Sequence, residues 1–163
     1  WLNDSRIRSA TESIQNGWQT ARNEASQRGA DVRFELTSAS VASWQICQLD
    51  APDDTCGGMK SVVIGSRTGV ELGLVVATSA LADKQGIKAL ALPIAGGTPA
   101  GITFNALGRP GRANGQSIGR IDVYGSKTPG RRLVILVSPG GMVRECDPAA
   151  ALSSSDAQSC GTN

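Results

Sequence analysis

Residues 2–29 have the sequence LNDSRIRSATESIQNGWQTARNEASQRG, and residues 32–36 have the sequence VRFEL. Within the first segment, apolar residues recur every three to five positions, a spacing that keeps one face of an α-helix apolar. These residues are Leu2, Ile7, Ala10, Ile14, Trp18, Ala21 and Ala25. Gly29, directly after Arg28, is typical of a helix C-terminus. We therefore predict one helix from Leu2 to Arg28, about 40 Å long, lying across a sheet, with Gly17 close to another backbone.

The hydrophobic period changes after Gly29. In residues 32–36, three apolar residues alternate with Arg33 and Glu35, which indicates a half-buried strand. Further short strands are predicted at 43–49, 61–64, 70–77, 87–94, 102–107, 118–124, 133–138 and 142–146, separated by turn-forming residues. The predicted fold class is α+β, with one long N-terminal helix packed on antiparallel sheets in a β-sandwich-like head. We expect a single domain over 1–163, with the helix in 1–29, the head in 30–147 and an irregular tail in 148–163.

The four cysteines are Cys47, Cys56, Cys146 and Cys160, and their spacing lacks the paired CxxC knuckles of a zinc site. Each neighbouring pair flanks a loop rich in turn-forming residues, so the simplest of three connectivities is Cys47–Cys56 with Cys146–Cys160, the second bond holding the tail. Disulfides imply an oxidising compartment. Four reduced thiols in the core of a cytosolic protein remain the alternative.

The composition disfavours an enzyme. The chain has no histidine, which removes Ser-His-Asp and Cys-His catalysis and most zinc sites. The segment Gly125-Ser126-Lys127-Thr128 lacks the spacing of a phosphate-binding loop. No pair of carboxylates is marked out for acid–base chemistry. We expect no catalytic residue, no cofactor and no metal.

Positive charge is concentrated in one stretch, although the net charge of the chain is only +2. Between residues 108 and 132 there are five arginines and one lysine against one acid, a local net charge of +5. Such a stretch is most often a solvated surface, and the alternative is a surface that binds nucleic-acid phosphates.

Three segments carry a resemblance to a known family. They are ARNEASQRG at 21–29, ITFNALGR at 102–109 and VSPGGMVREC at 137–146. In this order they resemble the GspH/FimT family of type IV minor pilins and type II secretion pseudopilins. The resemblance implies a structural, assembly-priming subunit of a pilus or pseudopilus, with other minor and major pilins or pseudopilins as partners. It also implies a periplasmic head and an apolar half-helix of about 25 residues ahead of Trp1 that anchors the protein in the bacterial inner membrane.

The same resemblance predicts how the helix is used. Its N-terminal part would be kept for the filament, with Leu2, Ile7, Ala10 and Ile14 as the interface. We therefore expect the apolar stripe to cover the sheet only along its C-terminal half. The surroundings of Leu2 and Ile7 should be exposed, and Trp18 should be buried.

A DNA-binding role in natural transformation is the alternative function, because some FimT-like members bind DNA through a G-R-x-R motif on the final strand. The matching positions here are Gly141 to Arg144, and Met142 replaces the first arginine. The candidate DNA contacts are Arg109, Arg112, Lys127, Arg131, Arg132 and Arg144. We expect weak, salt-sensitive binding at most. A disulfide-rich extracellular enzyme is a more distant third hypothesis.

Overall fold

The computed structural model describes residues 2–50, 55–58, 60–80, 91–93, 100–111, 117–127, 131–150 and 160. Helix α1 spans Leu2–Arg28, as its periodicity predicts. Gly29 follows with a φ of 59°, and the N–H of Ala30 donates to the carbonyl of Ala25 at 3.2 Å. This six-to-one bond satisfies a carbonyl of the last turn and ends the helix.

The strands form two antiparallel sheets. The four-stranded sheet has the order β3-β2-β1-β6 and consists of β1 (Val32–Leu36), β2 (Trp44–Gln48), β3 (Val62–Arg67) and β6 (Gly101–Phe104). The five-stranded sheet has the order β5-β4-β7-β8-β9 and consists of β4 (Leu74–Ala80), β5 (Leu92–Pro93), β7 (Ile118–Gly125), β8 (Arg132–Val137) and β9 (Val143–Cys146).

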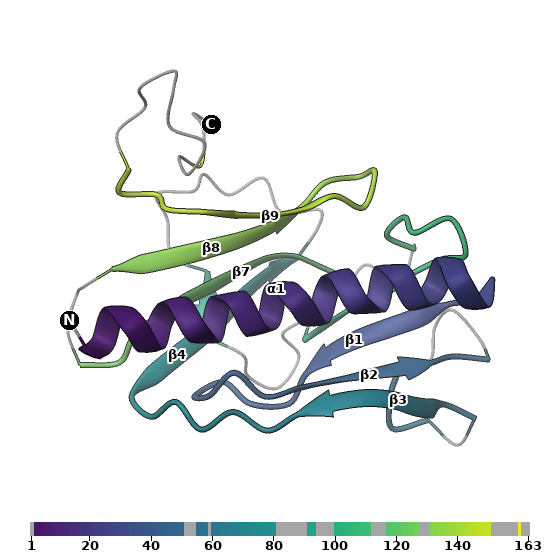
Figure 1. Cartoon of the computed structure of the whole chain (residues 1–163), viewed down its shortest axis with the longest axis horizontal. Coiled ribbons are helices and arrows are strands. Elements are labelled where there is room, and N and C mark those ends of the chain that lie inside the picture. The colour runs from purple at the N-terminus through teal and green to yellow at the C-terminus, as the bar shows by residue number, and fades with distance from the viewer. Residues whose placement is uncertain are drawn as a thin grey trace.

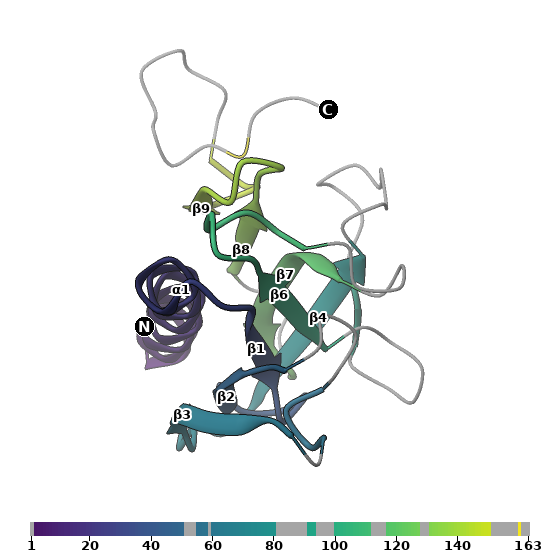
Figure 2. The same ribbon diagram turned by 90° about the vertical axis from the view of Figure 1, so that its right-hand side faces the viewer.

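The helix lies across both sheets. It contacts β1, β2 and β6 of the first sheet and β7, β8 and β9 of the second (Figures 1 and 2). The sheets meet where Gly101 forms a parallel bridge with Ser117. The α+β prediction is therefore confirmed, with one refinement. We expected two sheets that face each other as in a sandwich. In the structure, both sheets instead contribute to one surface on which the helix packs.

Four predicted strands differ clearly from the structure. The strand predicted at 61–64 extends to Arg67. The strand predicted at 70–77 begins only at Leu74, because Gly73 has a φ of 78° and interrupts extended pairing. The strand predicted at 102–107 ends at Phe104, where a turn begins. Of the segment 87–94, the structure describes 91–93, which contain the short strand β5, and the rest lies outside the described residues.

The apolar stripe of the helix is buried along nearly its whole length. Ile7 is 1% exposed, Ala10 and Ile14 are 0% exposed, and only Leu2 remains 74% exposed. The predicted exposure of Ile7 is therefore wrong. Ile7, Ala10 and Ile14 are buried in the protein's own core, which leaves them no surface for a filament partner. The physical reason is that the five-stranded sheet extends far along the helix: the loops at 72–73 and 125–127 beside it lie next to the first turns of α1.

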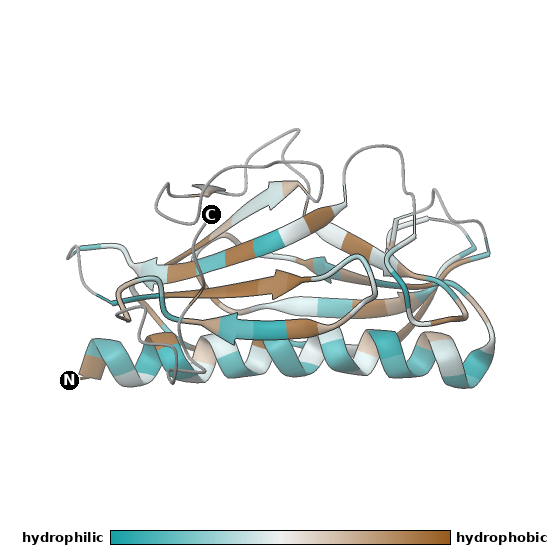
Figure 3. Ribbon diagram, turned by 90° about the horizontal axis from the view of Figure 1, so that it is seen from above, coloured by the Kyte–Doolittle hydropathy of each residue, from teal (hydrophilic) through white to brown (hydrophobic). Residues whose placement is uncertain are grey.

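Figure 3 shows a helix that is mostly hydrophilic or neutral and strands that carry most of the hydrophobic residues.

The middle of the helix crosses an aromatic cluster. A Cβ on Gly17 would lie 2.7 Å from Cε2 of Phe34 and 3.0 Å from Cε2 of Trp44, so the close approach predicted at Gly17 is to side chains rather than to backbone. The rings of Trp18 and Phe34 pack edge to face, with centroids 6.1 Å apart. Trp18 is fully buried, and its indole N–H has no hydrogen-bond partner among the described residues. The indole N–H of Trp44 donates to Oγ of Ser13 at 3.1 Å.

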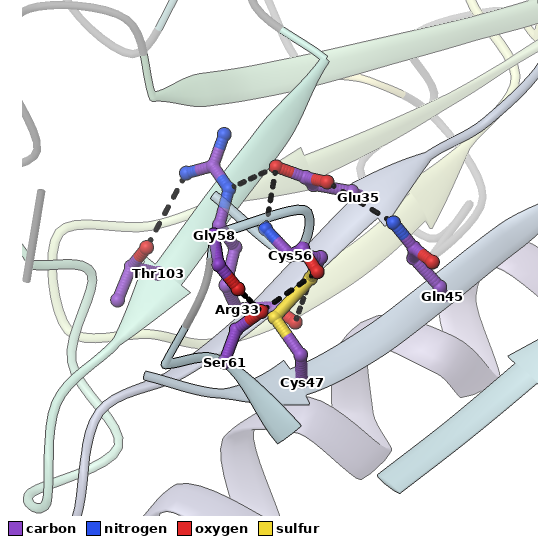
Figure 4. A network of polar contacts seen from close by, with 8 residues as sticks. All are labelled: Arg33, Glu35, Gln45, Cys47, Cys56, Gly58, Ser61 and Thr103. Carbon is purple, nitrogen blue, oxygen red and sulfur yellow. Dashed lines mark hydrogen bonds and ion pairs between the residues drawn. A yellow bond between two sulfur atoms is a disulfide. The ribbon is translucent and has the colours of Figure 1, made fainter. Parts of the chain in front are cut away.

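Two disulfides join Cys47 to Cys56 and Cys146 to Cys160, the same pairs that the loop spacing predicts. The first lies beside a polar network on the face of the sheet away from α1 (Figure 4). There Glu35 pairs with Nε of Arg33 at 2.6 Å and accepts the backbone N–H of Cys56 at 3.3 Å. The ion pair and the disulfide therefore hold the segment around Cys56 against the sheet.

Candidate functional site

The turn after β6 is built around one asparagine. Oδ1 of Asn105 accepts the backbone N–H of Leu107 at 3.0 Å and that of Arg109 at 3.1 Å. The N–H of Gly108 donates to the carbonyl of Asn105 at 2.8 Å, and Gly108 has a φ of 68°. The turn thus requires both residues, because asparagine closes it and glycine tolerates its left-handed position.

The turn between β8 and β9 has a similar design. The N–H of Gly141 donates to the carbonyl of Ser138 at 2.8 Å, and Oγ of Ser138 accepts the N–H of Met142 at 3.1 Å. Gly141 has a φ of 84° and is buried. A serine side chain and a glycine in the left-handed region therefore define this turn as well.

The two turns pack on each other and on the C-terminal part of α1. A Cβ on Gly141 would collide with the carbonyl oxygen of Gly108. On its other side, a Cβ on Gly108 would lie 3.0 Å from Oγ of Ser26 and 3.2 Å from Cγ of Arg22. The three sequence segments that carry the family resemblance thus meet at one place in the fold.

The surface of this meeting point combines apolar and cationic side chains. Leu107 is 75% exposed and Met142 is 66% exposed, although both are large hydrophobic residues. Arg109 is exposed and Arg22 is partly buried, and neither guanidinium has an acidic partner among the described residues. We call Arg22, Leu107, Arg109 and Met142 the junction surface. A shallow hollow of about 270 Å³ beside Arg22 and Met142 is part of it.

Comparison with known proteins places this arrangement in a family. The family model described as "Type II transport protein GspH" matches residues 10–141, from Ala10 in α1 to Gly141 in the turn after β8. The chain belongs to the GspH family. The match covers α1 from Ala10 onward, β1 to β8 and both glycine turns of the junction surface.

Solved structures show the same fold. A crystal structure of the type IV minor pilin FimU from Pseudomonas aeruginosa strain PAO1 has a TM-score of 0.56 at 15% sequence identity, covering 86% of this chain and 88% of that one. A second crystal form of FimU has a TM-score of 0.54 at 14% identity, covering 88% and 98% respectively. A search of curated proteins finds no significant match. The family match and the shared fold together support a minor pilin or pseudopilin role for this GspH-family chain.

Three of the six predicted DNA-contacting residues are bonded within the fold of this GspH-family structure. Arg131 pairs with Asp147 at 3.2 Å, and Arg132 pairs with buried Asp122 at 2.7 Å. Arg144 donates to the carbonyl of Cys160 at 3.1 Å. The remaining three candidates are Arg109 on the junction surface, Lys127 near the start of α1, and Arg112, which lies outside the described residues.

A charged groove runs beside the N-terminal half of α1. It is about 340 Å³ in volume and is lined by Arg8, Glu12, Arg131, Leu133, Glu145, Cys146 and Asp147. Burial and the neighbouring carboxylate of Glu12 raise the pKa of Glu145 above its usual value, while Arg8 and Arg131 oppose this rise. The groove therefore holds a carboxylate whose ionisation is disfavoured by its surroundings.

Sequence reasoning missed the buried ion pairs of both sheets. Asp122 is fully buried and accepts bonds from Arg120 at 2.6 Å and Arg132 at 2.7 Å. The available signal was spacing, because Arg120 and Asp122, like Arg33 and Glu35, are two residues apart and so share one face of a strand. Among the described residues, no cluster of His, Cys, Asp or Glu could hold a metal ion. Within the same residues, no helix has both the length and the apolar character that a bilayer span requires.

Proposed function

We propose that this GspH-family chain is a structural subunit that primes assembly of a type IV pilus or a type II secretion pseudopilus. The family match over residues 10–141 is the observation that carries the proposal, and the fold shared with FimU supports it. In this proposal the head lies in the periplasm, and an apolar segment ahead of Trp1 anchors the protein in the inner membrane. The protein acts by contacts with other pilins or pseudopilins and has no catalytic step.

We place the main contact with neighbouring subunits at the junction surface. Leu107 and Met142 are exposed at a point where rigid, glycine-dependent turns hold them in place. Exposed apolar side chains on a rigid frame bind a partner at a low cost in conformational entropy. Arg22 and Arg109 add positive charge beside them, so the surface suits an apolar segment flanked by acidic residues.

The test is allelic replacement in the source bacterium. Leu107→Glu combined with Met142→Glu should reduce surface pili, or secretion by the type II pathway, by at least tenfold, a loss on the scale of one interface hot spot. Val62→Glu is the matched control, because Val62 is 62% exposed on β3, which is the opposite edge of its sheet from β6 and the turn that follows it. Immunoblotting checks that both proteins accumulate equally.

Two outcomes would count against this proposal. If a deletion of the gene leaves both piliation and secretion unchanged, the assembly role is wrong. If the deletion abolishes one of them but the double variant behaves like Val62→Glu, the role stands and the junction surface is not the contact. The affected process also tells a pilus subunit from a secretion subunit.

A further inference from the structure

A second surface lies at the opposite end of the helix. There the start of α1 meets the loop between β3 and β4 and the turn after β7, as the N-labelled end of Figure 1 shows. Nη1 of Arg6 approaches the carbonyl of Leu72 at 3.5 Å, and Lys127 borders the same hollow. This end therefore brings together three chain segments that are far apart in the sequence.

The loop between β3 and β4 has its charged residue inside and its apolar residues outside. Glu71 is only 8% exposed, whereas Val70 is 81% exposed and Leu72 is 73% exposed. Glu71 is held inward by Nη2 of Arg67 at 2.5 Å and by the N–H of Val70 at 3.2 Å. Oγ of Ser43 anchors the loop further by accepting the N–H of Gly69 at 2.8 Å. Because the ion pair holds Glu71 inside, the side chains of Val70 and Leu72 on either side of it point into solvent.

Leu2, the first residue of α1, is 74% exposed, and its neighbours Asn3 and Arg6 border the same hollow as Leu72. Leu2, Val70 and Leu72 are three of the seven large hydrophobic residues that are exposed in the described part of the chain. The loop that carries Val70 and Leu72 lies beside the first turns of α1 at this end of the head. Exposed apolar side chains in such a place can enter an apolar layer.

The charges at this end are complementary to an anionic surface. Arg6 and Lys127 are exposed, and neither has an acidic partner among the described residues. Asp4, the acid of the first turn, lies in a different hollow with Arg8 and Arg131.

We propose that this end of the head, formed by Leu2, Arg6, Val70, Leu72 and Lys127, binds the surface of an anionic phospholipid bilayer. The three apolar side chains would enter the boundary between headgroups and acyl chains, and the two cations would contact lipid phosphates. The biological role of this binding rests on the proposed function, in which the head lies beside the inner membrane. The binding itself is a property of this chain and can be measured alone.

The experiment is vesicle sedimentation of the 163-residue chain. Vesicles of equal parts phosphatidylglycerol and phosphatidylethanolamine are compared with phosphatidylcholine vesicles, at low and at physiological salt. We expect binding to the anionic vesicles that weakens as salt rises. Lys127→Gln should lower the partition coefficient about fivefold on anionic vesicles, the effect of one cation near such a surface. Leu72→Ser should lower it by a similar or larger factor.

Matched controls lie at the other end of the molecule. Leu107→Ser removes a leucine of equal exposure, and Arg109→Gln removes an exposed cation, so neither should change vesicle binding. No binding to anionic vesicles would overturn the proposal, as would equal losses in the control variants. Leu72→Ser that changes self-association without vesicles, and not vesicle binding, would assign the surface to a protein partner. None of these outcomes bears on the assembly role, which the gene deletion tests separately.

Discussion

The carbonyl oxygen of Gly108 lies against the Cα of Gly141, so residue 141 has no room for a side chain. Both glycines have positive φ angles, and each is the residue that allows its turn to close. The packing of the junction surface therefore depends on two glycines from turns that are remote in the sequence.

Gly141→Ala should destabilise the fold by about 2–4 kcal/mol, because it adds a steric collision to the strain of a left-handed position. Denaturant unfolding measures the loss. Gly140→Ala is the control, because a Cβ there would meet only Oγ of Ser138 at 3.8 Å. It should stay within about 0.5 kcal/mol of the parent. Equal losses in the two variants would show that the turns do not pack in this way.

Local patterns predicted the elements of this fold well. The spacing of Ile14, Trp18 and Ala21 gave the helix its register, and Gly29 marked its end. Alternation around Phe34 located β1. These signals are local, since the helix period, the strand period and the stop residue are all set by neighbours in the sequence.

What could not be predicted depended on contacts between distant segments. Val70 and Leu72 alternate with Glu71 as in a strand with its apolar residues inside, yet the pairing of Arg67 with Glu71 reverses that arrangement. The packing of Gly108 on Gly141 could not be predicted from the sequence either, because no residue within one turn indicates which other turn it contacts. The expected exposure of Ile7 failed for the same reason: no local pattern shows how far the second sheet extends along the helix.

Trp18 tests the register of the helix. Trp18→Ala should destabilise by about 3–5 kcal/mol, since it would leave a large cavity beside Phe34. Trp18→Phe should cost less, about 1–2 kcal/mol, because it also removes an indole N–H with no partner among the described residues. A chemical melt of both variants decides this. A loss below about 1 kcal/mol for Trp18→Ala would mean that the indole faces solvent.

The disulfides close short loops, with sequence separations of 9 and 14 residues. Replacing Cys47 and Cys56 together by serine should lower the free energy of unfolding by about 2–4 kcal/mol, and replacing Cys146 and Cys160 should have a similar effect. Peptide mapping without reductant checks the pairs directly. A peptide that links Cys47 to Cys146 would contradict this connectivity.

DNA binding should be weak, because the candidate residues that the structure describes are dispersed or already bonded. Arg109 and Lys127 lie near opposite ends of α1, roughly 25–35 Å apart along its axis. A labelled duplex titrated at two salt concentrations should therefore show a log–log slope of only about −2 or −3, the release expected for two or three phosphates. Tight binding at physiological salt that Arg144→Ala abolishes would favour the DNA-receptor role instead.

The raised pKa of Glu145 should be detectable in the pH dependence of stability. Burial, and then the charge of Glu12, raise its pKa in the folded protein above the ordinary 4.5. The folded state therefore binds more protons than the unfolded state between these two pKa values, so stability falls as pH rises through that window. Glu145→Gln removes this penalty, and its melting temperature relative to the parent should increase from pH 4 towards neutrality.

Glu71 provides a control of opposite sign. Burial alone would raise its pKa, but the bonds from Arg67 and the backbone N–H groups outweigh burial, so the pKa of Glu71 is lowered. Its contribution to stability is present above its unfolded pKa and is lost as pH falls through the folded one. Glu71→Gln should therefore be less stable than the parent at neutral pH, with a deficit that shrinks in acid. Thermal melts of both variants across this range test the pair, and parallel curves for Glu145→Gln and the parent would contradict the assignment of the raised pKa to the groove.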